Sequence, residues 1–118
     1  MDKKKIIELY YQKIDAEELD WVVDLFTEDA LYQRADMIYA DRQSIAHFYR
    51  FERGIRGKHT LAGILAEGEV VAAYGKFEGV GADGSPRTVE FCDIWNFDGS
   101  KVKRRQSYLS FGSEYVKK

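Results

Sequence analysis

The chain has 118 residues, of which 45% are hydrophobic and 32% charged, and its formal net charge is −2. This size and balance are typical of one globular domain with a core of its own. The near-neutral charge gives no reason to expect binding to nucleic acid, which depends on clustered positive charge.

Two helices are predicted at the start of the chain. Apolar residues at helical spacing predict the first over residues 3–14, and they are Ile6, Ile7, Tyr10, Tyr11 and Ile14. The pattern restarts over residues 15–26, where Asp15 and Glu18 resemble a capping box. The charged start lacks the apolar stretch of a signal peptide, and no apolar run is long enough to cross a membrane. We therefore expect a cytoplasmic protein that contacts no membrane.

Residues 27–42 show no clear periodicity, and we expect a short strand and a loop there. Arg34 and Asp36 lie in this segment, where the rim of a binding pocket is often built. Solvated loop charges are the alternative for both residues. A third helix is predicted over residues 42–53, with Asp41 as its N-terminal cap.

The character of the sequence changes to β from His59 onward. Residues 59–80 predict two strands joined at AEGE, and the turn that follows holds the only proline. Residues 88–97 and 101–111 predict two further strands joined by the turn DGS. Helices followed by an antiparallel meander predict a single α+β domain over residues 1–118, with the helices on one face of a curved sheet. A strongly curved sheet closed by helices makes a cone, and a cone encloses a cavity.

The strand TVEFCDIWNF places a carboxylate in the middle of its apolar face. Alternate residues of a strand share a face, and here they are Val89, Phe91, Asp93, Trp95 and Phe97. A shift by one residue would expose three aromatic rings together, so Asp93 is predicted to be buried. Its charged form is disfavoured there unless a cation or a hydrogen-bond donor compensates. Asp93 is thus a candidate pocket acid, and the alternative is a structural ion pair with Arg105 of the next strand.

His59 opens the first long strand and is a candidate base, since histidine titrates near neutral pH. A half-exposed histidine at a strand start is the alternative. Tyr10, Tyr32 and Tyr74 are candidate hydroxyl donors, because each lies on or beside an apolar face. For each of these tyrosines taken singly, core packing is the favoured alternative.

The sequence gives little support for a metal or an organic cofactor. His59 and Asp93 are only two candidate ligands, whereas catalytic zinc usually takes three. Cys92 is the only cysteine, which excludes an internal disulfide and a cysteine metal cluster. The sequence has neither a glycine-rich phosphate loop nor a G-x-S-x-G nucleophile turn. We expect a protein that works without metal or cofactor.

Three segments follow one another at a characteristic spacing: DAEELDWVVDLFTEDALY, YADRQSIAHFY and DIWNFDGSKVKRRQSYL. Together they resemble the SnoaL-like polyketide cyclase group of the nuclear transport factor 2-like superfamily, whose relatives include ketosteroid isomerase. The resemblance covers about residues 3–111. It implies a cone-shaped α+β fold with a deep apolar pocket, usually as a homodimer.

The same resemblance implies roles for several residues. Asp93 falls where the isomerase has a neutral pocket acid that hydrogen-bonds the developing enolate oxygen. In the cyclases an aspartate of the sheet is the general acid/base of an aldol closure. Tyr10 falls near the isomerase's oxyanion tyrosine. The isomerase's proton-shuttling aspartate coincides with Arg34, although a short gap would bring in Asp36, so the base is His59 or, less simply, Asp36.

Three functions are compatible with these observations. The first is a cofactor-independent cyclase or isomerase that acts on a hydrophobic, polyketide-like carbonyl compound, in which His59 or Asp36 removes a proton and Asp93 stabilises the enolate. The residues expected to contact the substrate are Tyr32, Arg34, Tyr74, Phe91, Trp95, Phe97 and Arg105. The second is a non-catalytic small-molecule-binding or dimerisation module, and the third is a dehydratase or hydrolase on the same scaffold. If Arg105 pairs with Asp93, and tyrosine and tryptophan side chains fill the cavity, the enzyme hypothesis fails.

Overall fold

A curved sheet and three helical segments make up residues 2–110, the part of the chain that the computed structural model describes. The helices are α1 (Lys3–Asp15), α2 (Leu19–Asp24) and α3 (Arg42–His47), which continues as a π-helical turn, η1 (Phe48–Glu52). The strands are β1 (Phe26–Arg34), β2 (Met37–Ala40), β3 (Arg56–Glu67), β4 (Val70–Val80), β5 (Pro86–Asp98) and β6 (Lys101–Leu109).

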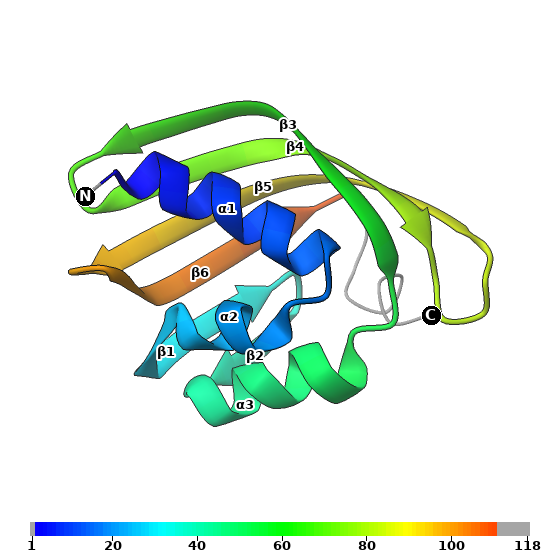
Figure 1. Cartoon of the computed structure of the whole chain (residues 1–118), viewed down its shortest axis with the longest axis horizontal. Coiled ribbons are helices and arrows are strands. Elements are labelled where there is room, and N and C mark those ends of the chain that lie inside the picture. Colours follow the sequence, from blue (N-terminus) through cyan, green and yellow to red (C-terminus); the bar gives the residue numbers. More distant parts are fainter. Residues whose placement is uncertain (1, 111–118) are drawn as a thin grey trace.

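The six strands are ordered β2-β1-β6-β5-β4-β3. Every neighbouring pair is antiparallel except β1 and β6, which run parallel. The sheet is strongly curved and the helices lie on its concave side, with α1 against β3 and β4, and α2 and α3 against β1 (Figure 1). This arrangement confirms the predicted α+β fold, in which helices cover one face of a curved sheet. No helix within residues 2–110 is long and apolar enough to cross a membrane.

Strand β5 alternates as predicted. Its buried residues are Val89, Phe91, Asp93, Trp95 and Phe97, and the residues between them are partly or fully exposed. The buried residues of α1 are four of the five in the predicted stripe, Ile7, Tyr10, Tyr11 and Ile14, and the fifth, Ile6, is partly buried. These two faces meet in the hydrophobic core, which therefore lies between the helices and the concave side of the sheet.

The second helix is shorter than predicted, because Asp15 ends α1 instead of capping α2. Glu17 adopts a left-handed conformation with φ of 59°, which breaks the helical path after Asp15. Glu18 becomes the N-cap of α2 and makes no capping hydrogen bond with its side chain. The predicted capping box is therefore wrong, and the carboxylate of Asp15 binds His59 of β3 instead.

A β-hairpin, β1–β2, occupies most of the segment that showed no periodicity. The inward residues of β1 include Ala30, Tyr32 and Arg34, all of them buried. A small residue and a buried cation on the inward face conceal the alternation that normally identifies a strand.

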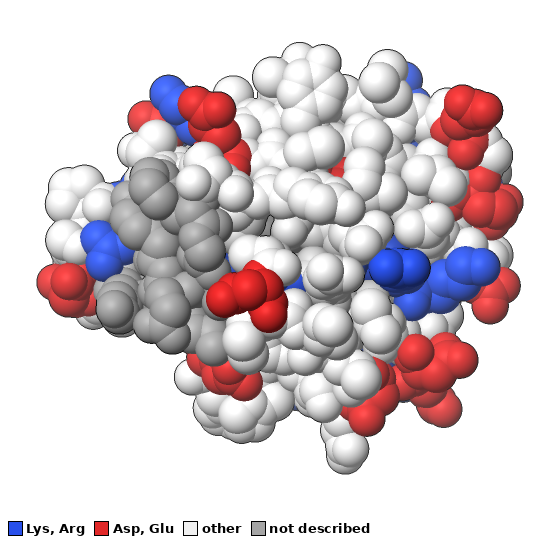
Figure 2. Space-filling model, turned by 180° about the vertical axis from the view of Figure 1, so that it is seen from behind, with Lys and Arg blue, Asp and Glu red and all other residues white. Residues whose placement is uncertain are grey.

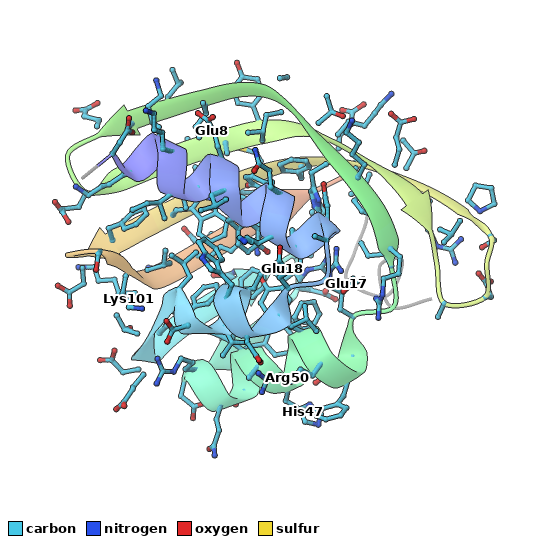
Figure 3. All side chains as sticks on the ribbon, viewed as in Figure 1. Glu8, Glu17, Glu18, His47, Arg50 and Lys101 are labelled. Carbon is cyan, nitrogen blue, oxygen red and sulfur yellow. The ribbon has the colours of Figure 1, made fainter. Side chains whose placement is uncertain are left out.

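The third helix begins as predicted, since the carboxylate of Asp41 accepts a hydrogen bond from the backbone nitrogen of Ser44 at 2.8 Å. Its wider continuation, η1, buries the consecutive residues Phe48 and Tyr49. His47 is exposed on the outer side of this helix (Figure 3).

Two nearby residues of α1 offer a matched test of this packing. Ile7 is fully buried in the core, whereas Leu9 keeps 37% of its surface exposed. Ile7→Ala leaves a cavity and should lower the free energy of unfolding by about 2–5 kcal/mol. Leu9→Ala should lower it by about 1 kcal/mol or less. Urea denaturation followed by circular dichroism measures both values, and equal losses in the two variants would contradict the packing of α1.

Candidate functional site

Four successive rows of inward side chains on the sheet bound a cavity of about 30 Å³. The rows join residues paired across neighbouring strands: Tyr32 with Arg105; Arg34, Ser107 and Asp93; Leu109 with Phe91; and Val89, Phe77 and His59. Ile55 completes the lining. A cavity of this size holds only a few water molecules or a very small ligand, and it is far below the volume of a typical drug-sized pocket.

Asp93 lies at the centre of this wall and is 2% exposed. Its Oδ2 accepts hydrogen bonds from Tyr11 Oη at 2.5 Å and from Arg105 Nη2 at 2.9 Å, and its Oδ1 accepts one from Ser107 Oγ at 2.5 Å. Three donors, one of them a cation, are the environment of an ionised carboxylate. Of the two alternatives for Asp93, the structure shows the ion pair with Arg105. A neutral Asp93 that donates a hydrogen bond to an enolate does not fit this geometry.

Arg105 is also buried, and aromatic rings enclose its guanidinium group. The guanidinium carbon lies 4.3, 4.6 and 4.8 Å from the ring centroids of Trp95, Tyr32 and Tyr10. Its Nη1 donates hydrogen bonds to the hydroxyls of Tyr10 at 2.6 Å and Tyr49 at 2.7 Å. Burial alone lowers the pKa of Arg105, but the charge of Asp93 and the tyrosine hydroxyls outweigh it, and the net shift is upward. Burial also raises the pKa of the Tyr10 and Tyr49 hydroxyls, so both stay protonated.

His59, on β3, is held by the last residue of α1. Asp15 Oδ1 lies 2.6 Å from His59 Nδ1, and Asp15 Oδ2 accepts a hydrogen bond from the backbone nitrogen of His59 at 2.9 Å. Because a carboxylate can only accept, Nδ1 carries the ring proton and Nε2 keeps a lone pair. Burial lowers the pKa of His59, and Asp15 offsets only part of this shift, so the neutral imidazole predominates near pH 7.

The ring of His59 is accessible from two sides. It lines the cavity, and it also lines an open groove of about 490 Å³ between α1 and β3. The rings of Tyr11, Phe77 and Phe91 lie 4.9–5.3 Å from it, centroid to centroid. The imidazole therefore sits in a mostly apolar wall, with 12% of its side chain exposed.

Arg34, the last residue of β1, places a second cation on the cavity wall and is 6% exposed. Its Nε donates a hydrogen bond to Tyr32 Oη at 3.1 Å, and its guanidinium carbon lies 5.0 Å from the ring centroid of Phe48. The hydroxyls of Tyr32 and Ser107 are 3.2 Å apart, and Ser107 donates to Asp93. Two hydroxyls thus connect Arg34 to Asp93, whereas Arg34 Nη1 has no hydrogen-bond partner in the described part of the chain, residues 2–110.

Comparison with known protein families assigns the chain. The family model of the SnoaL-like domain matches residues 7–105. The chain belongs to the SnoaL-like domain family. This assignment confirms the resemblance seen in the sequence. A comparison with curated protein sequences found no match.

Solved structures support the fold of this SnoaL-like domain. A candidate polyketide cyclase from Pseudomonas putida matches with a TM-score of 0.80 at 19% identity, covering 98% of this chain and 96% of that one. A ketosteroid isomerase-like protein from Catenulispora acidiphila, in complex with trimethylamine, matches with a TM-score of 0.80 at 17% identity, covering 98% and 91%. An epoxide hydrolase from M. tuberculosis matches with 0.79 at 15% identity, covering 97% and 84%. At these identities the likeness establishes the fold and not the activity.

The predicted site residues fall into two groups in this SnoaL-like domain. Those that line the cavity are Asp93, His59, Tyr32, Arg34, Phe91 and Arg105. Those that do not line it are Tyr10, Asp36, Tyr74, Trp95 and Phe97.

Tyr74 and Asp36, both predicted for the site, do not line this cavity. Tyr74 lies on the outer face of β4 and is 44% exposed, because the buried, inward residues of this strand are Val71, Ala73 and Phe77. A small inward residue made the tyrosine look like the core residue of this strand. Asp36 is exposed in the tight turn between β1 and β2, where it does not reach the cavity.

Tyr10, Trp95 and Phe97 are buried in the core beyond the cavity. The hydroxyl of Tyr10 is engaged with Tyr49 and Arg105, so it does not face a ligand as an oxyanion donor would. These rings fill the space in which the family resemblance led us to expect a deep apolar pocket. The cavity is small for this reason.

Three residues of the site were not predicted: Asp15, Tyr11 and Ser107. Asp15 was interpreted as a helix cap, and nothing local in the sequence connects it to His59. Tyr11 follows Tyr10 in the same apolar stripe and was treated as core. Ser107 had a usable signal, since it lies two residues after Arg105 and therefore on the same face of the last strand. Within residues 2–110, no three histidine, cysteine or carboxylate side chains come together as metal ligands would.

Asp93→Asn tests the ion pair, because it keeps the shape of the side chain and removes the charge that faces Arg105. Removing one partner of a buried pair should lower the free energy of unfolding by about 3–5 kcal/mol. Asp98→Asn, an exposed aspartate at the end of the same strand, is the control and should leave the stability unchanged. Urea denaturation at pH 7 measures both variants. A loss below about 1 kcal/mol in Asp93→Asn would mean that Asp93 is not ionised in this environment.

Proposed function

We propose that this SnoaL-like domain is a small cofactor-independent enzyme that removes a proton from the carbon beside a carbonyl group, with His59 as the base. One observation carries the proposal: in a partly buried Asp–His pair the histidine lies at the cavity wall, with the Nε2 of His59 unoccupied by any side chain of residues 2–110. Enolate formation of this kind is the first step of both the cyclase and the isomerase reactions, and it requires a positioned base and stabilisation of the developing negative charge.

The proposed step uses three side chains in different roles. Nε2 of His59 takes the proton, and the electrons of the C–H bond move toward the carbonyl oxygen to give an enolate. Asp15 holds the ring through Nδ1 and stabilises the imidazolium as it forms. Arg34, whose buried side chain lines the same cavity, supplies positive charge that stabilises the enolate. The imidazolium then returns the proton at a second position, which regenerates the base.

Asp93 has a different role in this proposal from the one predicted. Its oxygens are taken by Tyr11, Ser107 and Arg105, so it neutralises Arg105 and fixes two hydroxyls at the cavity wall. Asp93 is thus a positioning residue. It is not a proton donor to the substrate.

The substrate that fits is shorter than the polyketide-like compound expected from the sequence. A cavity of about 30 Å³ admits only a very small carbonyl compound. The half of the wall next to His59 is apolar, and it consists of Phe91, Phe77, Val89, Leu109 and Ile55. A short alkyl group beside the reacting carbon suits that half of the wall.

A non-catalytic module of the same fold is the second candidate, and a specific observation favours it. Arg105 pairs with Asp93, and tyrosine and tryptophan rings fill the interior, which are the two conditions set for that alternative. By this criterion the enzyme hypothesis drawn from the sequence, with His59 as the base and Asp93 as the acid, fails. The proposal made here keeps His59 as the base, with Asp15 holding its ring, and replaces Asp93 by Arg34 as the group that stabilises the enolate.

Deuterium exchange separates the two candidates without knowledge of the complete reaction. Short ketones and β-dicarbonyl compounds are incubated with the protein in D₂O, and loss of the proton signal beside the carbonyl is followed by NMR. The wild type should catalyse exchange, and His59→Gln should reduce the rate by about 10²–10⁴-fold, as removal of a general base does. His47→Gln is the matched control and should exchange at the wild-type rate. A folded wild type that exchanges no compound in the panel, or a fully active His59→Gln, would leave the non-catalytic module as the function.

The pH dependence supplies a second readout of the same prediction. Because burial lowers the pKa of His59 below about 6.5, activity should be level near pH 7 and decline only in more acidic solution. Asp15 raises the pKa of His59, so Asp15→Asn should move this acid limb to still lower pH while reducing the rate. A merely structural Asp15 would reduce activity without moving the limb, and NMR titration of the His59 ring checks the shift directly.

We also propose that a second copy of the chain covers the outer face of the sheet, as the family resemblance implies. Uncharged side chains cover most of the middle of this face, with charged groups mainly around them (Figure 2), and its exposed residues include Leu65, Tyr74 and Tyr108. Tyr74, Cys92 and Tyr108 lie in one row across β4, β5 and β6. A group of exposed apolar and aromatic side chains on one face is typical of an interaction site.

The oligomeric state tests this proposal directly. Light scattering coupled to size-exclusion chromatography should show a dimer for the wild type and a monomer for Tyr108→Arg. Gln43→Arg, which adds the same charge at an exposed position of α3, should remain dimeric. A monomeric wild type at about 100 μM, well above the Kd of a stable dimer, would contradict the proposal.

A further inference from the structure

Positive charge exceeds negative charge in the interior of this domain. The buried charged residues of the described chain are the three arginines Arg34, Arg53 and Arg105 and one carboxylate, Asp93. Asp93 is committed to Arg105 by their hydrogen-bonded ion pair. Two buried guanidinium groups therefore remain without a carboxylate hydrogen-bonded to them among residues 2–110.

Arg34 is fixed in place although its charge is not neutralised. Tyr32 accepts a hydrogen bond from its Nε, and the ring of Phe48 lies under its guanidinium plane. These contacts leave Nη1 without a hydrogen-bond partner among residues 2–110, and the side chain is only 6% exposed and lines the cavity. A buried donor that lacks a partner costs free energy, and an uncompensated buried charge costs more. A carboxylate held beside the guanidinium would offset this charge.

Arg53 adds to the surplus of positive charge. It follows η1, is 7% exposed, and its guanidinium makes no hydrogen bond to residues 2–110. Burial lowers its pKa, and the positive charge of Arg34 lowers it further, which shows that the two cations act on each other. Glu17, just after α1 (Figure 3), is the carboxylate that acts on Arg53, but it forms its ion pair with Arg56. A negatively charged ligand group beside Arg34 would offset the repulsion between the guanidinium groups of Arg34 and Arg53.

We propose that the cavity binds the carboxylate group of its substrate on Arg34, so that the substrate is a short keto acid with its reacting carbon toward His59. The inference deepens the proposed function and rests on it for the reacting carbon, but carboxylate binding is measured without turnover. A planar guanidinium favours a carboxylate, because two N–H donors match its two oxygens.

The size of the cavity limits the substrate to a few carbon atoms. Arg34 of β1 and His59 of β3 both line the cavity of about 30 Å³, although β6, β5 and β4 lie between their two strands. Their rows are also four residues apart on β5, from Asp93 to Val89, which is about 13 Å of extended backbone. A small molecule with a carboxylate at one end and a carbonyl close to it therefore fits the cavity better than an extended one.

Binding of acetoacetate, followed by NMR at constant ionic strength, tests the inference. Wild-type signals of residues around the cavity should shift with saturation, and Arg34→Gln should weaken binding by about 10–100-fold, which is the loss of one charge-assisted hydrogen bond. Arg50→Gln removes an exposed guanidinium paired with Asp20 and should bind like the wild type. Acetylacetone, a neutral diketone of similar length, should bind weakly to all three proteins, and phosphate should bind less tightly than acetoacetate.

The melting temperature of the empty protein provides the second arm. Arg34→Gln removes an unneutralised buried cation, so the empty variant should melt at the same temperature as the wild type or higher, while acetoacetate should stabilise only the wild type. A lower melting temperature with undiminished acetoacetate binding, or equal binding of acetylacetone and acetoacetate, would overturn the inference. Carboxylate binding without deuterium exchange would support the inference and count against the proposed function. Deuterium exchange without tighter binding of acetoacetate than of acetylacetone would support the proposed function and count against the inference.

Discussion

The ion pair between Asp93 and Arg105 determines how this SnoaL-like domain is assembled. Burying two charges costs several kcal/mol each unless hydrogen bonds replace the lost water, and here the replacements come from every layer of the molecule. Tyr10 and Tyr11 of α1, Tyr49 of η1 and Ser107 of β6 all direct hydroxyls at the pair. Since Tyr10 and Tyr11 are consecutive, the pair fixes both the rotation of α1 about its axis and its height above the sheet.

Because of this arrangement, the groups that are free to act on a ligand lie away from the centre of the sheet. The rings that enclose Arg105 occupy the middle of the cone, and the acid predicted to act on a substrate is held by three donors. The groups with unused capacity lie at two ends of the remaining space, namely the imidazole of His59 and the guanidinium of Arg34. The many hydrogen bonds around the ion pair also keep the surrounding wall rigid, although Arg105 Nε has no partner among residues 2–110, and a base needs a rigid wall in order to hold its orientation.

The sequence predicts the parts of this structure that depend on periodicity and not those that depend on long-range pairing. The alternation of β5 is sufficient to bury Asp93, and the cap of α3 is visible in Asp41. The β1–β2 hairpin was not predicted in full, because its inward face contains Arg34, and hydrophobic periodicity assigns a charged residue to the outer face. Asp15 and His59 are 44 positions apart, and only the path of α1 across β3 brings them together. The outward position of Tyr74 was not predicted, because its inward neighbour Ala73 is too small to identify the buried face of β4.

If a carboxylate occupies the cavity, its binding changes the base strength of His59. Burial lowers the pKa of His59, and the positive charge of Arg53 lowers it further, whereas Asp15 acts in the opposite direction. A carboxylate held by Arg34 would add negative charge to the same low-dielectric space, where charges act strongly on one another. It would raise the proton affinity of His59 and offset the effect of Arg53. The imidazole would then be a weaker base in the empty protein and a stronger one when the substrate is bound. The buried arginines would in this way make proton abstraction depend on the presence of the substrate.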